Sequence, residues 1–84
     1  PDSKEQYLRS KEQAAAERKA RSRKKKNAEE TAKLEAELEK VIAAQSDEEK
    51  QSDYVHMNEL YERQQEIETR LMELYEEAES FGED

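Results

Sequence analysis

The sequence predicts an all-α fold, an antiparallel two-helix coiled-coil hairpin forming a single domain over residues 1–84. The first observation is a heptad stripe near the C-terminus, where apolar residues recur at alternating steps of three and four around a polar Gln64. Such spacing keeps one face of a helix against a partner helix. The second observation is a composition with 45% charged residues, one Gly and one Pro, which suits long polar helices. The stripe consists of Met57, Leu60, Ile67, Leu71, Leu74, Ala78 and Phe81.

The N-terminal half of the chain predicts a first helix over residues 4–44. This stretch has no Gly or Pro and is dominated by Ala, Glu, Lys, Arg and Leu, which are all good helix formers. Near its end it carries a second, shorter stripe at the same spacing. That stripe consists of Thr31, Leu34, Leu38 and Val41, and it is the natural partner for the longer one.

The sequence predicts a turn over residues 45–52 and a second helix over residues 53–81. The turn segment is polar and rich in Ser and Asp. The heptad phase also requires a break, because Thr31 and Met57 both hold the first heptad position but lie 26 residues apart, three heptads plus five. One continuous coiled-coil helix would therefore turn its stripe away from the partner midway. Gly82 fits a helix stop directly after the second stripe.

The two stripes meet in an antiparallel pair if the residue numbers of facing positions add to 98. Polar residues gather toward the open end of this arrangement, so we expect good packing near the turn and marginal packing at the open end. Three tyrosines, Tyr54, Tyr61 and Tyr75, share one heptad position beside the stripe and are expected to shield the flank of the core. The predicted facing pairs are Val41–Met57, Leu38–Leu60, Leu34–Gln64, Thr31–Ile67, Asn27–Leu71, Lys24–Leu74, Ala20–Ala78 and Glu17–Phe81.

Charge is divided unequally along the chain. Residues 1–26 hold ten Lys and Arg against four Asp and Glu, a balance of +6, whereas residues 27–84 hold five against nineteen, a balance of −14. Positive charge is densest over residues 18–26, where seven of nine residues are Lys or Arg. One interpretation is a solvated helix face whose charges pair with carboxylates of the second helix. In the predicted register these carboxylates are Glu73, Glu76, Glu77 and Glu79.

The other interpretation of this basic block is a phosphate-binding rod. Lys and Arg on a rigid helix can neutralise several backbone phosphates without recognising sequence. No aromatic residue interleaves the block, so stacking on unpaired bases is not predicted. Lys24 is expected to lie along Leu74 in the seam, with its ammonium group in water. The remaining candidates for nucleic-acid binding are Arg18, Lys19, Arg21, Arg23, Lys25 and Lys26.

No residue pattern in the chain indicates an enzyme, a metal site or a cofactor site. There is no Gly-rich phosphate loop, metal-ligand cluster or nucleophile–base arrangement. His56 is the only His and is expected to be an ordinary surface residue. The absence of Cys excludes disulfides. No apolar run approaches the length of a membrane span, so no membrane partner is expected and a cytoplasmic location is the default.

Several segments follow one another in a characteristic order: a Lys/Arg/Glu-rich first helix, Lys33–Lys40, an acidic turn, Ser52–Tyr54, Asn58–Leu60 and Glu73–Glu77. This order resembles the C-terminal domain of the ABC-F ATPases, soluble Uup-like members of the ABC superfamily with two ATPase cassettes. The resemblance covers about residues 10–81. Two features depart from the family, which often has a Pro in the turn and a Trp near the end of the second helix, where this chain has Ala78.

The resemblance implies that the chain is a C-terminal fragment of a larger ATPase whose ATP-binding cassettes lie before Pro1. It also implies a role in translation on the ribosome and nucleic-acid binding, to DNA or ribosomal RNA. We expect a monomer. Three alternatives remain open: a structural or protein-interaction coiled coil with no nucleic-acid binding, a dimer through the Met57–Phe81 stripe, and a basic helix on anionic membrane, whose mostly Ala face is too small to insert.

Overall fold

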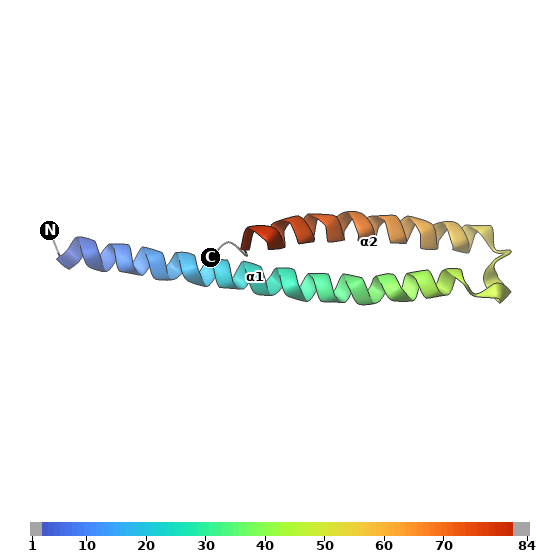
Figure 1. The fold of residues 1–84 in the computed structure, drawn as a ribbon, viewed down its shortest axis with the longest axis horizontal. Helices are drawn as coiled ribbons and strands as arrows, with labels where there is room; N and C mark the ends of the chain where they lie inside the picture. The colour runs from blue at the N-terminus through green and yellow to red at the C-terminus, as the bar shows by residue number, and fades with distance from the viewer. Residues whose placement is uncertain (1–2, 82–84) are drawn as a thin grey trace.

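The computed structural model is a helical hairpin and confirms the predicted all-α class (Figure 1). It describes residues 3–81. The helix α1 spans Ser3–Gln45, a short 3-10 helix η1 spans Glu48–Lys50, and α2 spans Tyr54–Phe81. These bounds lie within one residue of the helices expected at 4–44 and 53–81. The helix stop predicted at Gly82 lies outside the described residues.

The hairpin is long and thin, with extents of 74 × 16 × 15 Å. At ~1.5 Å per residue, α1 is about 65 Å long and α2 about 42 Å. Figure 1 shows that α2 folds back along the C-terminal part of α1 and ends well before the N-terminus of α1. The N-terminal part of α1 therefore extends beyond α2 as a single helix.

The turn is built by two aspartates in place of Gly or Pro. The carboxylate of Asp47 accepts a hydrogen bond from the backbone N–H of Glu49 at 3.1 Å, which caps η1. The carboxylate of Asp53 accepts one from the backbone N–H of His56 at 3.0 Å, at the start of α2. Both contacts satisfy backbone donors that the first turn of a helix leaves without an intrahelical partner.

The core lies along the two predicted stripes. Val41, Ile67, Leu71 and Leu74 form the buried cluster, and Ile67 and Leu74 are each only 1% exposed. Leu34, Leu38 and Leu60 pack against this cluster, and Met57 is buried near the turn. Beyond Asn27 and Leu74 the predicted seam positions Ala20, Lys24 and Ala78 are exposed. The core is thus continuous near the turn and ends before the open end, as the sequence predicts.

The register differs from the prediction by about one helical turn. The side-chain amide of Asn27, predicted to face Leu71, donates a hydrogen bond to the backbone carbonyl oxygen of Leu74 at 2.9 Å. Within residues 3–81, the cross-helix hydrogen bonds of Asn27, Gln45 and Tyr75 join residues whose numbers add to between 101 and 110, where the predicted facing pairs add to 98. The observed register gives the buried Asn27 amide two acceptors, Leu74 O and Glu77 Oε1, which explains why it is favoured.

The three tyrosines predicted to shield the flank of the core are all exposed, Tyr75 the least of them at 42%. The hydroxyl of Tyr75 reaches across to α1 and donates a hydrogen bond to the Glu35 carboxylate at 2.7 Å. Tyr54 and Tyr61 are instead 76% and 51% exposed, so they shield little of the core.

Candidate nucleic-acid interface

The basic block occupies α1 at the level where α2 ends. Residues 18–26 are all exposed, and they cover about 12 Å of helix axis at ~1.5 Å per residue. Asn27, the next residue, is buried against α2. The block therefore begins where the core stops and continues toward the single-helix part of α1.

The heptad phase divides the six predicted site residues into two groups. Because Thr31 and Leu38 hold the first position, Arg18 and Lys25 fall in the second and Lys19 and Lys26 in the third. Those positions face away from a partner helix. These four side chains make two adjacent rows on the outer side of α1, hereafter the outer rows.

Arg21 and Arg23 form the second group, because they flank the side of α1 that faces α2. Together with Lys24 they line a hollow of about 490 Å³ at the end of α2, hereafter the junction hollow. Its other lining residues are Ala20, Glu77, Ser80 and Phe81. Lys24, predicted to lie along Leu74, is exposed and lines this hollow instead, because Asn27 occupies the position beside Leu74. Lys24 is therefore a site residue that was not among the candidates predicted from the sequence.

The expected pairing of the basic block with α2 carboxylates is absent from residues 3–81. The ion pairs in this part of the chain belong to Arg63 and Arg70, each of which joins one glutamate of α1 and one of α2. Among the four carboxylates predicted to face the block, Glu73 pairs with Arg70 and Glu77 accepts a hydrogen bond from Asn27. Because α1 is longer than α2 and the register is shifted, the positive charges of the block face solvent.

The two cross-helix ion pairs lie nearer the turn and set the local carboxyl pKa values. Arg63 donates two hydrogen bonds to Glu37, at 2.6 and 2.7 Å, and Arg70 donates two to Glu30, both at 2.8 Å. These hydrogen bonds lower the pKa of both glutamates and raise the pKa of both arginines. These ion pairs join the two helices. Because both guanidinium groups are already paired with carboxylates, neither is available to bind an external anion.

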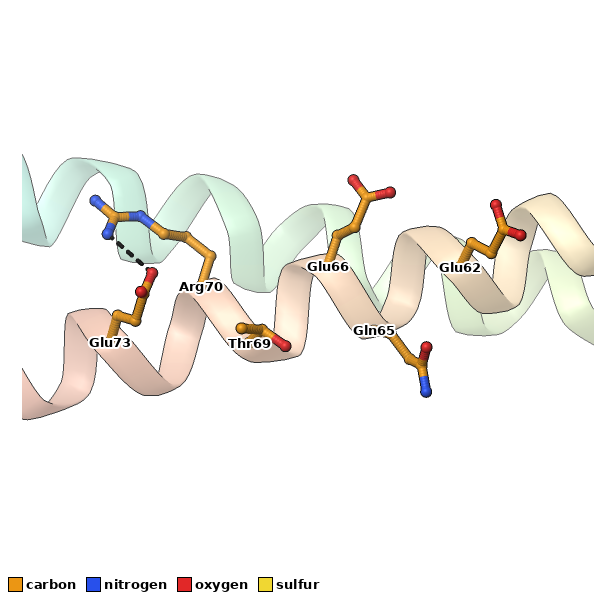
Figure 2. Close-up of a pocket in the computed structure, with 6 residues that line it drawn as sticks. All are labelled: Glu62, Gln65, Glu66, Thr69, Arg70 and Glu73. Atoms are coloured by element: carbon orange, nitrogen blue, oxygen red, sulfur yellow. Dashed lines mark hydrogen bonds and ion pairs between the residues drawn. The ribbon is translucent and has the colours of Figure 1, made fainter.

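A second depression, on α2, has the opposite electrostatic character. Figure 2 shows its lining side chains, all of which come from α2, with Arg70 bonded to Glu73. Three carboxylates, Glu62, Glu66 and Glu73, line the depression together with this single guanidinium. Such a surface repels phosphate, which leaves the basic block as the candidate site for a polyanion.

Within the described residues, the remaining site types find no support. No group of three or more His, Cys, Asp or Glu side chains is placed to hold a metal ion. No helix among residues 3–81 combines the length and apolar character needed to cross a membrane. His56 is half-buried at the first turn of α2, and its backbone N–H donates to the capping Asp53.

Comparison with models of protein families, with curated proteins and with solved structures gave no match to this chain. The resemblance to the ABC-F C-terminal domain therefore remains a prediction that depends on the segments quoted above. The candidate interface is defined by geometry and charge alone.

Proposed function

We propose that this chain is an accessory nucleic-acid-binding module whose basic block contacts the phosphate backbone of DNA or ribosomal RNA. The observation that carries the proposal is that Arg18, Lys19, Arg21, Arg23, Lys25 and Lys26 are exposed and take part in no ion pair within residues 3–81. In the competing model of a purely structural coiled coil, these charges would serve an internal ion-pair lattice.

The shape of the hairpin suits contacts to a phosphate backbone. The outer rows present Arg18, Lys19, Lys25 and Lys26 from a rigid helix, on the side away from the acidic α2. Contacts of this kind position a protein on nucleic acid and carry no sequence information. The parent protein, on the resemblance stated above, is a cytoplasmic ABC-F ATPase acting in translation, whose ATP-binding cassettes lie outside this chain.

The proposal is tested by anisotropy titration of labelled duplex DNA and of structured RNA with the chain. The logarithm of the binding constant is expected to fall linearly with the logarithm of salt concentration, by about 0.9 per phosphate contact for duplex DNA. The variant R21Q/R23Q/K25Q/K26Q is expected to lose binding.

A matched variant separates the basic block from total charge. K4Q/R9Q/K11Q/K33Q also removes four positive charges, from positions outside the block. It is expected to retain most of the affinity. Equal loss in both variants, or no binding by the unaltered chain at about 50 mM salt, would reject the proposal and favour the structural coiled coil.

A further inference from the structure

The junction hollow combines positive charge with an aromatic side chain, which the basic block lacks in sequence. Phe81, the last residue of α2, lies beside Ala20 and Lys24 of α1 because the hairpin brings the two helices together there. Phe81 is half-buried, so part of its ring remains accessible. Because these residues are far apart in the sequence, the aromatic ring and the positive charges come together only in the folded chain.

We propose that the junction hollow binds an unpaired nucleotide of single-stranded nucleic acid, with the base against Phe81 and the phosphate on Arg21 and Arg23. This inference rests on the proposed function and deepens it by naming a preferred class of ligand. Bases stack on aromatic side chains with little regard to sequence, whereas a base inside a duplex has no free face to offer. The outer rows can therefore contact the phosphates of either duplex or single-stranded nucleic acid, whereas the hollow binds only an unpaired nucleotide.

The electrostatics of the hollow agree with an anionic ligand. Among the described residues that line the hollow, Arg21, Arg23 and Lys24 contribute three positive charges and Glu77 contributes one carboxylate. That carboxylate accepts a hydrogen bond from Asn27 at 2.7 Å, which holds it against the inner side of the seam. The Ser80 hydroxyl donates to the backbone carbonyl oxygen of Glu77 and keeps its lone pairs for a ligand donor.

The size of the hollow also fits. Its volume of about 490 Å³ falls within the ~300–1,000 Å³ of ordinary small-ligand sites. It is open to solvent, so a nucleotide bound there can remain part of a longer strand. A guanidinium or ammonium group near Phe81 can add a cation–π contribution to the stacked arrangement.

The experiment compares binding of oligo(dT), oligo(rU) and a duplex of equal phosphate count. Phe81→Leu is expected to lower affinity for both single strands by at least about fivefold and to leave duplex affinity unchanged. Phe81→Tyr, which keeps the aromatic face, is expected to retain the single-strand affinity. Tyr54→Leu, which removes an exposed aromatic residue far from the hollow, is expected to change neither.

A direct readout of stacking is available because the chain contains no Trp. The fluorescence of the variant Phe81→Trp is expected to be quenched by either oligonucleotide and much less by the duplex. Quenching by only one oligonucleotide would assign the hollow to DNA or to RNA and still support it. Equal binding of duplex and single strands, with no effect of Phe81→Leu, would overturn the inference while leaving the proposed function intact. Failure to bind any of the three would overturn both.

Discussion

The side-chain amide of Asn27 on α1 donates a hydrogen bond to the backbone carbonyl oxygen of Leu74 on α2, at 2.9 Å. Asn27 is 6% exposed and Leu74 is 1% exposed, so the contact lies inside the seam. The same amide group donates to Glu77, and the Asn27 carbonyl oxygen accepts from the Thr31 hydroxyl. One buried polar residue thus ties the register of the hairpin to a single arrangement. Polar residues at core positions of coiled coils commonly specify register at a cost in stability.

Replacing Asn27 by Leu is expected to raise the melting temperature and to loosen the register. The added apolar surface stabilises the seam, but no hydrogen bond then distinguishes alignments one turn apart. Disulfide trapping measures the register, because the chain has no Cys of its own. The pair Ala20→Cys/Phe81→Cys should cross-link in the unaltered background and Glu17→Cys/Phe81→Cys should not. With Asn27→Leu present, both pairs should cross-link, and unchanged selectivity would contradict the assignment.

Leu74 is expected to be among the most sensitive core positions. Leu74→Ala should lower the free energy of unfolding by about 2–5 kcal/mol, because the side chain is almost fully buried and its truncation removes apolar contacts and leaves a cavity. Urea unfolding followed by circular dichroism measures the loss. Met72→Ala is the matched control, since Met72 is 59% exposed on the same helix. Its effect should stay within about 0.5 kcal/mol, and a similar loss in both variants would contradict the described core.

Much of the fold follows from local patterns in the sequence. The stripe from Met57 to Leu74 sets which face of α2 is buried, and the phase difference from Thr31 to Met57 requires the turn. The first depends on residues close together in the chain, and the second only on the spacing between the two stripes along the sequence. Neither determines the register, because sliding the stripes by one turn still buries apolar residues against each other. It is decided by long-range contacts, above all the bond between Asn27 and Leu74.

The candidate site shows the same division. The basic block is visible in the sequence as a run of Lys and Arg over residues 18–26. The junction hollow is not, because Phe81 reaches Ala20 and Lys24 only through the observed register. The predicted register placed Phe81 opposite Glu17, away from most of the basic block. It also placed Lys24 opposite Leu74, so the exposure of Lys24 was not predicted.

The paired glutamates are expected to make part of the stability depend on pH. Hydrogen bonds from Arg70 and Arg63 lower the pKa of Glu30 and Glu37 below the ordinary value of 4.5. Their stabilising contribution is therefore fully present above that value and is lost as the pH falls through the lowered pKa values. Melting temperatures of the unaltered chain and of E30Q/E37Q should differ at pH 7 and converge once the pH lies below the lowered pKa values.

The control for this pH dependence is E29Q/E39Q, which removes two exposed carboxylates of the same helix that take part in no ion pair within residues 3–81. It removes the same charge without touching the cross-helix pairs. Its melting temperature should change little relative to the unaltered chain at pH 7. A difference as large as that of E30Q/E37Q would assign the effect to net charge instead of the ion pairs.

Asp53 is expected to determine how firmly α2 begins. Its carboxylate accepts from the backbone N–H of His56 at 3.0 Å, and its carbonyl oxygen accepts from the N–H of Met57 at 3.0 Å. Asp53→Ala removes only the first of these and should cost about 1 kcal/mol of stability. Asp53→Asn keeps a side-chain oxygen at the cap and should cost little, because Asn caps helices about as well as Asp. Since the turn contains neither Gly nor Pro, loss of this cap should also raise hydrogen exchange at His56 and Met57 before the rest of α2. Uniform exchange along α2 in Asp53→Ala would show that the turn is held by the core instead of by the cap.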